Sequence, residues 1–526
     1  MQDVTTKRTA LTRAASAGVS GLLAGFAALA AAELVAAAVR PEAGPITAVG
    51  GAAIDLTPAP VKDWAIRSFG TNDKLVLQLG IVSVLVLFAL ALGLLALRHR
   101  RIGAAGVLVF GVVGTVAAVS RPDSQSWTDA LPSLIGALIG SAVLYLLIGA
   151  LTPAPVDGRE PDTGRDRRAF LIAASAAAVA SAGVGTLGRS LTARHGKDAV
   201  ASRTAVLLPR PASAAAAIPP DAQLRVPGMK PFTTPNKDFY RVDTALVVPK
   251  VDATAWRLRI HGKGVQRPLT LTFQELLNRE LIERDITLTC VSNEVGGPYV
   301  GNARWIGVRL ADLLREAGVK PPSRGGRADQ LVARSVDGMT LGTPVDAVMD
   351  GRDAMLALGM NGEPLPFDHG FPVRMVVPGL YGFVSACKWI EDIELTTFDD
   401  YDPYWVKRGW AREAPIKTQS RIDTPKPFAR PGAGTVMIAG VAWAQHRGID
   451  RVEVRVDDGP WRRADLAAQH TVDTWRQWSL PWKATSGNHT LSVRATDRAG
   501  EIQTEKRAKT VPDGASGWHT VVVEVE

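Results

Sequence analysis

The order of apolar and polar residues changes character near residue 190. Before that point, long apolar runs alternate with short polar segments. After it, short apolar runs are mixed with charged residues throughout. An apolar run of about 20 residues is long enough to cross a bilayer as a helix. The pattern therefore predicts a membrane domain over residues 1–188 with five transmembrane helices, at Ala14–Val39, Leu75–Leu97, Ile102–Ser120, Ala130–Leu151 and Ala169–Gly188.

Basic residues gather on one side of the predicted helices. One cluster precedes the first helix, one separates the second from the third, and one separates the fourth from the fifth. The opposite loops carry mixed charge, as in Lys62-Asp63 and Asp73-Lys74. Because loops rich in Lys and Arg remain cytoplasmic, this predicts a multi-pass protein of the cell membrane with residues 189–526 on the extracytoplasmic side. The clusters are Lys7, Arg8 and Arg13; Arg98, Arg100 and Arg101; and Arg159, Arg165, Arg167 and Arg168.

The fifth apolar run is milder than the others and follows two adjacent arginines. Arg167-Arg168, followed by the apolar pair Phe170-Leu171, resembles a twin-arginine export signal placed inside the chain. That export route moves proteins that have already folded. A plain membrane helix with flanking arginines explains the same residues, so both interpretations remain open.

The rest of the chain predicts a linker and two globular domains. Residues 189–235 lack a sustained hydrophobic period and are rich in Ala and Pro, which is typical of a linker. Over residues 236–424, strand-like alternation such as Trp256–His261 mixes with amphipathic helices such as Val308–Gly318, which predicts an α+β domain. Over residues 425–526, short strands separated by turns predict an Ig-like β-sandwich.

Composition narrows the kind of protein. Two cysteines among 526 residues allow at most one disulfide, and no cysteine–histidine spacing is typical of a zinc site. The net charge of +9 at pH 7 would suit a nucleic-acid partner. Many of the basic residues, however, lie beside the apolar runs, where membrane topology explains them, so no nucleic-acid partner is expected.

The candidate chemistry centres on Cys290, in the stretch Thr287–Gly297. Alternating apolar residues around Cys290 predict the end of a buried strand, and Asn293 with two glycines predicts a loop directly after it. A thiol at such an edge can face a cleft, and a thiolate is a soft ligand for a transition metal. A free cysteine is also a common buried packing residue, so the thiol by itself leaves both interpretations open.

Four further stretches combine polar side chains with glycine-rich or apolar surroundings. They offer two arginines, a histidine and a lysine, a set that could bind a phosphate-bearing ligand through backbone amides and cationic side chains. Taken singly, His369 could be an ordinary loop histidine and Arg374 a surface ion pair. The stretches are Asn236–Arg241, Ser335–Thr340, Asp368–Arg374 and Gly379–Trp389.

Several motifs, in this order, closely resemble the sulfite oxidase family of molybdenum–pterin enzymes. The resemblance covers residues 232–526, and the C-terminal sandwich is similar to the dimerisation domain of that family, which makes a homodimer an expected assembly. The motifs are Thr289–Asn293, Asn302–Leu310, Asn361–Pro366 and Asp368–Gly379, with Ala439–Trp443, Trp475–Trp478 and Arg494–Asp497 in the sandwich.

The resemblance implies a molybdenum–molybdopterin cofactor with the Cys290 thiolate as the protein ligand on the metal. It also implies that Tyr240 and Arg241 line the entrance to the cofactor, where Arg241 would attract an anionic substrate. The other residues expected to bind the pterin and its phosphate are Asn236, Asp337, His369, Arg374, Ser385 and Lys388.

Two positions depart from the family pattern. Val295 stands where sulfite oxidases carry an arginine that helps to hold the oxyanion. Trp410 stands where they carry a tyrosine that is important for turnover. The cofactor site therefore matches the family, whereas the pocket for sulfite is altered.

The predicted function is oxygen-atom transfer in the oxidation of sulfite or a related small sulfur compound. The electrons would pass to a separate carrier, a quinone or a cytochrome at the membrane, because the sequence contains no haem or iron–sulfur motif. One alternative is the reduction of a sulfoxide of the methionine-sulfoxide type, which Val295 favours because a neutral substrate needs no second arginine. Another is a membrane-anchored binding or structural protein without catalysis. Whether Cys387 forms a disulfide is left open.

Overall fold

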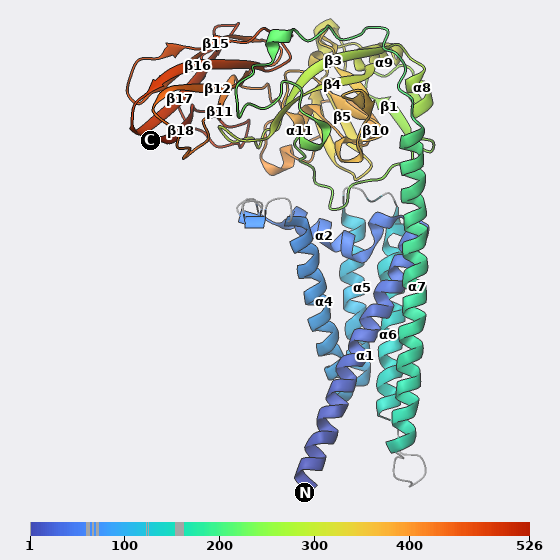
Figure 1. Cartoon of the computed structure of the whole chain (residues 1–526). Coiled ribbons are helices and arrows are strands. Elements are labelled where there is room, and N and C mark those ends of the chain that lie inside the picture. The colour runs from blue at the N-terminus through green and yellow to red at the C-terminus, as the bar shows by residue number, and fades with distance from the viewer. Residues whose placement is uncertain are drawn as a thin grey trace. The chain divides into compact units, whose positions relative to one another are not determined.

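The computed structural model in Figure 1 describes residues 2–58, 61, 64–65, 68–69, 73–121, 124, 126–152 and 163–526. The chain divides into two compact units. One comprises Met1–Asp198 with Ala245–Val248, and the other comprises Ala199–Thr244 with Pro249–Glu526. Lys62, Asp63 and Arg159, on which the topology prediction draws, lie outside the described residues.

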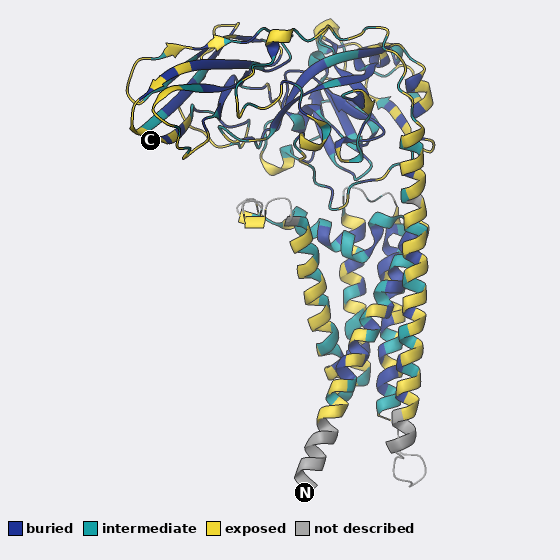
Figure 2. Ribbon diagram, viewed as in Figure 1, coloured by how far each residue is buried: buried dark blue, intermediate teal, exposed yellow. Residues whose placement is uncertain are grey.

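The first unit is built of helices. In the part of the chain that the structure describes, five helices are long and apolar enough to cross a membrane, and the five predicted runs fall on them. Figure 2 shows exposed residues along these helices. The exposed apolar side chains include Leu87, Val109 and Leu138. A large exposed apolar surface of this kind is typical of contact with lipid. The helices are α1 (Gln2–Val39), α2 (Pro45–Leu56), α4 (Asp73–Arg98), α5 (Arg100–Ser120), α6 (Leu131–Leu151) and α7 (Thr163–Ala205), of which α2 is too short to span.

Glycines allow α1 and α4 to approach closely. A Cβ atom added at Gly21 of α1 would lie 1.9 Å from the backbone oxygen of Ala89 in α4. A Cβ atom added at Gly93 of α4 would lie 2.1 Å from the backbone oxygen of Ala17 in α1. No side chain fits at these distances, so the two glycines determine how closely the helices pack.

Helix α7 extends beyond the predicted fifth span. Residues 189–205, expected to belong to a linker, continue the helix to Ala205. The reason is local, since this segment is rich in Ala and contains no Pro before Pro209.

The second unit begins with two sheets that share one hydrophobic core, which includes the fully buried Trp305, Leu258 and Phe371. One sheet has the strand order β2-β1-β10-β5-β6 and the other has the order β3-β4-β7-β8, with β9 also paired to β7. The strands are β1 (Arg257–Gly262), β2 (Leu269–Thr272), β3 (Leu281–Thr289), β4 (Val300–Arg309), β5 (Gln330–Ser335), β6 (Thr340–Pro344), β7 (Met355–Met360), β8 (Glu363–Pro364), β9 (Arg374–Val376) and β10 (Ile390–Thr396).

Short helices connect these strands, and their ends follow local sequence signals. Helix α8 is capped by Thr272, whose hydroxyl accepts a hydrogen bond from Glu275 N at 3.1 Å while the Glu275 carboxylate accepts one from Thr272 N at 2.7 Å. The mixture of helices and strands agrees with the predicted α+β class. The helices are α8 (Phe273–Leu277), α9 (Leu310–Glu316), α10 (Val345–Met349) and α11 (Gly382–Ser385).

The C-terminal part contains strands in two four-stranded sheets. Their orders are β11-β12-β16-β15 and β14-β13-β17-β18. Ile438 and Trp478 from the first sheet and Val454, Leu491 and Val523 from the second bury their side chains in one common core. The strands are β11 (Gln419–Thr424), β12 (Gly434–Trp443), β13 (Ile449–Val456), β14 (Arg462–Arg463), β15 (Asp465–Leu466), β16 (Arg476–Ala484), β17 (Gly487–Asp497) and β18 (His519–Val525).

Candidate active site

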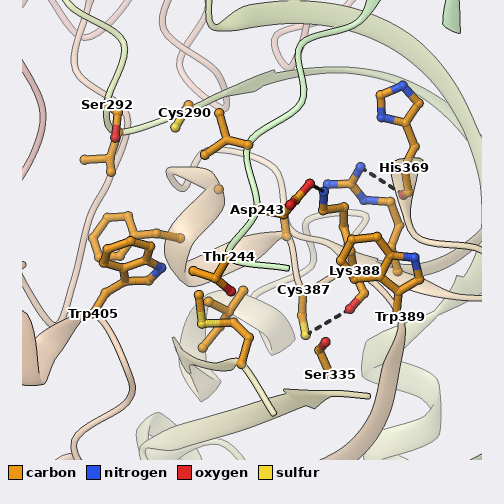
Figure 3. A pocket seen from close by; sticks show the side chains of 18 of the residues that line it. Asp243, Thr244, Cys290, Ser292, Ser335, His369, Cys387, Lys388, Trp389 and Trp405 are labelled. Carbon is orange, nitrogen blue, oxygen red and sulfur yellow. Dashed lines mark hydrogen bonds and ion pairs between the residues drawn. The ribbon is translucent and has the colours of Figure 1, made fainter. Parts of the chain in front are cut away.

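A cavity of about 140 Å³ opens at the C-terminal end of β3, within the second unit (Figure 3). Its wall combines the segment after Phe239, the turn that contains Cys290, the β5–β6 turn and the stretch around α11. The stretch with His369 and Arg374 and the segment with Trp405 and Trp410 also contribute, so six parts of the chain that are separate in sequence meet at one place. The polar and sulfur-containing residues of the wall are Tyr240, Asp243, Thr244, Cys290, Ser292, Ser335, Asp337, Met339, His369, Arg374, Cys387 and Lys388.

Cys290 lies where the sequence pattern places it, at the point where β3 becomes a turn. Its backbone N–H donates to Tyr299 O at 3.0 Å, and its carbonyl accepts from Asn293 N at 3.0 Å. The thiol is buried, lines the cavity and takes part in no disulfide. Burial raises the pKa of the Cys290 thiol, with Ser292 and Lys388 opposing that effect. The thiol therefore keeps its proton at pH 7.

Two cations, the buried Arg374 and the largely buried Lys388, face the same cavity. Lys388 Nζ donates to Asp243 Oδ2 at 2.8 Å, and burial lowers the pKa of Lys388 to about 8. Arg374 is 5% exposed and donates through Nη1 to His369 O at 3.3 Å. Its Nε atom has no hydrogen-bond partner among the described residues, and burial lowers the pKa of Arg374 to about 10. Arg374 is therefore not the surface ion pair that the sequence allowed, but a buried cation whose Nε lacks an acceptor among the described residues.

His369 and Asp337 complete the polar wall. His369 Nε2 lies 2.9 Å from Asn236 O, and burial lowers the pKa of His369 to about 4, so the ring is neutral at pH 7 and donates this bond. Burial raises the pKa of Asp337, which bonds the hydroxyl of Ser335. His369 is thus a buried residue of the cavity wall and not an exposed loop histidine.

Three of the predicted site residues do not line the cavity. Arg241 is 40% exposed in its side chain and pairs with Asp368 at 3.0 Å and with Asp243 at 3.6 Å. Asn236 bonds Met360 O through its amide and accepts from His369 through its backbone carbonyl. Ser385 is fully buried and donates to the backbone oxygens of Leu380 and Tyr381, both at 3.0 Å, within the turn of α11.

Sequence reasoning missed Asp243 and most of an aromatic wall. Phe383 and Trp410 pack at 5.6 Å between ring centroids, and Trp405 and Trp410 at 6.1 Å. Figure 3 shows Trp405 on one side of the cavity and His369 and Lys388 on the other. The only signal in the sequence was the unusual Trp410, because isolated aromatic residues and a single aspartate carry no pattern that marks a pocket.

Two family models match most of the second unit of the chain. Residues 245–405 match the family model of the oxidoreductase molybdopterin binding domain, and residues 414–526 match that of the Mo-co oxidoreductase dimerisation domain. Fold and site therefore define a molybdopterin-dependent oxidoreductase.

Known relatives indicate which family of molybdopterin-dependent oxidoreductases the chain belongs to. The chain is 31% identical over 323 residues to sulfite oxidase of Gallus gallus, with 53% of this chain and 69% of that protein covered. It is 29% identical over 345 residues to mitochondrial sulfite oxidase of Mus musculus, with 56% of this chain and 62% of that protein covered. The chain belongs to the sulfite oxidase family. The crystal structure of the sulfane dehydrogenase SoxCD from Paracoccus pantotrophus is similar at a TM-score of 0.49 and 26% identity, over 57% of this chain and 84% of that chain.

The cofactor of this family is molybdenum–molybdopterin, and the cavity has the chemistry to hold it. A cavity-lining thiol supplies a soft metal ligand, and the buried Arg374 offers an unpaired N–H to an anionic group such as a phosphate. Among the described residues, no cluster of three or more His, Cys, Asp or Glu could hold a metal ion. A metal at Cys290 would therefore need ligands that a cofactor brings.

Proposed function

We propose that this protein is a membrane-anchored molybdenum enzyme that transfers an oxygen atom to sulfite or a related small sulfur compound. The observation that carries this proposal is a cavity in which the Cys290 thiol and two cations, the buried Arg374 and the largely buried Lys388, face the same space. When bound, the molybdenum centre supplies two-electron oxygen-atom transfer. The protein would supply a metal ligand and cationic side chains around the cofactor.

The residues have distinct proposed roles. Cys290 would ligate the metal, whereas Arg374, Lys388 and the neutral His369 would hold the pterin and its phosphate. Asp243 keeps Lys388 charged and in place, since the two side chains form an ion pair at 2.8 Å.

The remaining predicted residues would act at the margins of the cavity. Asp337 and Tyr240 line it and would contact the pterin. Asn236 would orient His369, and Ser385 would hold the turn of α11. Arg241 would attract an anionic substrate at the entrance, if its pairing with Asp368 opens.

A second candidate function is the reduction of a neutral sulfoxide of the methionine-sulfoxide type. The specific observation in its favour is the aromatic wall of Phe383, Trp405 and Trp410, together with the engagement of Arg241 by two aspartates. A neutral substrate with an apolar group would bind such a wall well and would need no free arginine. The third alternative, a binding protein without catalysis, has no support from the family comparisons.

We further propose an organisation for the whole chain. Residues 1–188 would form a membrane domain with five spans, 189–235 a connecting segment, 236–424 the cofactor domain, and 425–526 an Ig-like domain that forms a homodimer. The cofactor domain would lie on the extracytoplasmic side, after export that uses the twin-arginine motif. A quinone or a cytochrome at the membrane would accept the electrons.

Metal analysis and two assays test the proposal. Protein isolated from membranes should contain molybdenum and pterin in equal amounts, and it should oxidise sulfite with an artificial acceptor. Faster turnover of a sulfoxide with an artificial donor would favour the second candidate. Protein without molybdenum would contradict both.

The change Cys290→Ser tests the role of the thiol. Because a serine hydroxyl is a much poorer ligand for this metal than a thiolate, we expect turnover to fall by roughly a thousandfold or more while the fold persists. Circular dichroism checks the fold. Turnover at the wild-type rate would refute the role of Cys290.

A further inference from the structure

The strand that carries Cys290 lies at the edge of its sheet. Strand β3 pairs with β4 along one side only, so the backbone groups of its other side need different partners. Near the start of β3, the segment around Ser213 supplies them. Ser213 N donates to Leu281 O at 3.2 Å, and Glu283 N donates to Ser213 O at 2.8 Å.

Closer to Cys290, the partners come from the C-terminal domain. Thr287 N donates to Asp473 O at 2.9 Å, and Thr287 O accepts from Gln445 Nε2 at 3.0 Å. The hydroxyl of Thr287 accepts from Trp475 N at 2.8 Å. Two loops of the C-terminal domain therefore complete the hydrogen bonding of the strand.

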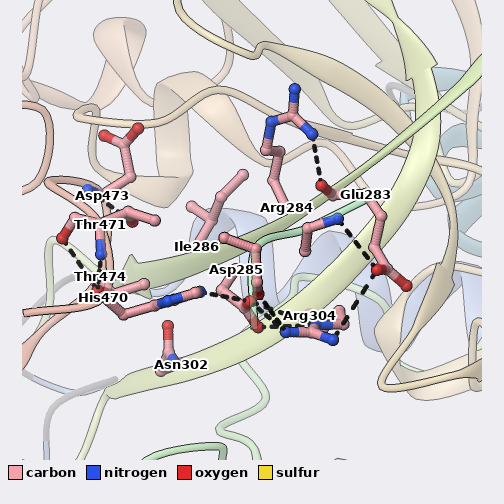
Figure 4. A network of polar contacts seen from close by, with 12 residues as sticks. Glu283, Arg284, Asp285, Ile286, Asn302, Arg304, His470, Thr471, Asp473 and Thr474 are labelled. Atoms are coloured by element: carbon pink, nitrogen blue, oxygen red, sulfur yellow. Dashed lines mark hydrogen bonds and ion pairs between the residues drawn. The ribbon is translucent and has the colours of Figure 1, made fainter. Parts of the chain in front are cut away.

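A polar contact fixes the same strand to the same loops. Figure 4 shows Arg304 and His470 reaching the carboxylate of Asp285, which is 2% exposed. Asp285 Oδ2 lies 2.7 Å from Arg304 Nη2 and 2.8 Å from His470 Nε2. In addition, Trp443 and Trp475 are part of the core of the cofactor domain. The C-terminal domain is thus packed against β3.

Gln445 makes the link nearest to the thiol. Its Nε2 also donates to the hydroxyl of Thr289 at 3.0 Å, and Thr289 directly precedes Cys290. The Gln445 side chain is fully buried, so no water competes for these bonds. From the opposite side, Cys290 N is held by Tyr299 O at 3.0 Å. The residues on both sides of the strand end therefore restrict the direction in which the thiol points.

We propose that Gln445 is a positioning residue for the Cys290 thiol. By bridging Thr287 O and the Thr289 hydroxyl, its amide holds the last residues of β3 in place, so that the thiol faces the cavity. The C-terminal domain then takes part in building the active site. The importance of this for catalysis rests on the proposed function, but the orientation of the thiol can be measured without any metal.

The test compares Gln445→Met with Gln503→Met in the full-length chain, purified in detergent from cells that cannot make the cofactor. Methionine has a similar length but cannot donate a hydrogen bond. Gln503 is a matched control because it is also buried. It accepts from Ser420 at 2.6 Å and donates to Gly517 O at 2.8 Å, all within the C-terminal domain.

The measured quantity is the rate at which iodoacetamide alkylates Cys290, followed by mass spectrometry with Cys387 as the internal reference. Gln445→Met should raise this rate by roughly tenfold. That factor corresponds to a decrease of ~1.4 kcal/mol in the free energy needed to open the end of β3. Gln503→Met should leave it unchanged. Equal rates in the two variants, or no change in Gln445→Met, would overturn the proposal.

Two further measurements keep the inference separate from the proposed function. Thr289→Val removes the hydroxyl acceptor at nearly constant volume and should raise the alkylation rate in the same direction; an unchanged rate counts against the proposal. In cofactor-loaded protein, Gln445→Met should shift the electron paramagnetic resonance spectrum of the molybdenum centre, whereas Gln503→Met should not. If wild-type protein contains no molybdenum, the proposed function fails while the alkylation result still decides the role of Gln445.

Discussion

At the scale of single residues, burial controls protonation around the cavity. Burial lowers the pKa of His369, Arg374 and Lys388, and it raises the pKa of Cys290. All four shifts favour the neutral form, because a charged group loses hydration when it is buried. Lys388 keeps its charge at pH 7 with the help of the Asp243 carboxylate. Like the Asp243 carboxylate, an anionic ligand in the cavity would favour the charged form of Lys388 and so raise its pKa.

The pKa of His369 predicts how stability depends on pH. In the folded protein this pKa is about 4, against about 6.5 in an unfolded chain, so the unfolded state binds more protons between these values. The free energy of unfolding should therefore fall as the pH is lowered from 6.5 to 4, by up to ~1.4 kcal/mol per pH unit from this residue. His369→Gln keeps a donor for Asn236 O but cannot titrate, and it should flatten this slope in denaturant titrations.

His519 provides the comparison for this experiment. Burial also lowers its pKa to about 4, but it lies in the C-terminal domain, where its Nδ1 accepts from Ile422 N at 3.0 Å. His519→Gln should reduce the pH dependence of the free energy of unfolding by a similar amount. In the double variant, the two reductions should add. If His369→Gln leaves the dependence of the free energy of unfolding on pH unaltered, His369 is already protonated, or exposed, in the folded protein.

At the scale of elements, glycines decide where helices of the first unit can meet. Gly21→Ala would place a methyl group 1.9 Å from the Ala89 backbone oxygen, so α1 and α4 would have to move apart. Gly80→Ala in α4 meets nothing within 4 Å. We expect Gly21→Ala to lower the thermal unfolding midpoint of the full chain in detergent. Gly80→Ala should raise it slightly, because Ala is favoured over Gly in a helix by about 1 kcal/mol. Equal midpoints would mean that the two helices do not pack through Gly21.

At the scale of the whole molecule, the β-sheets beyond residue 414 complete the core of the cofactor domain. Trp443 and Trp475 are each 1% exposed and share that core with Trp305, and Trp475 Nε1 donates to Phe232 O at 2.9 Å. This chain, if shortened to residues 199–424, would therefore expose a large apolar surface.

This shared core predicts which fragment folds alone. Residues 199–526 should give a protein with a cooperative unfolding transition and slow proteolysis. Residues 199–424 should aggregate or be degraded rapidly, because both tryptophans and the partners of Thr287 are missing. Limited proteolysis and near-ultraviolet circular dichroism distinguish the two. A stable, folded 199–424 fragment would contradict the argument.

Local sequence signals predicted the elements well, and contacts between distant residues less well. The five apolar runs and the strand before Cys290 depend on neighbours in the chain, so their pattern is visible in the sequence. The end of α7 was missed because a helix rich in Ala and a flexible linker have similar composition.

For the site, the residue types indicated a thiol and cations, and the resemblance of several motifs to the sulfite oxidase family implied the cofactor. Only the tertiary structure decided which of them share one space. It brings Cys290, His369, Arg374 and Lys388 to one cavity and leaves Arg241 paired with aspartates outside it. The physical reason is that burial, ion pairing and the partners of a sheet edge depend on residues hundreds of positions apart, and no local pattern encodes them.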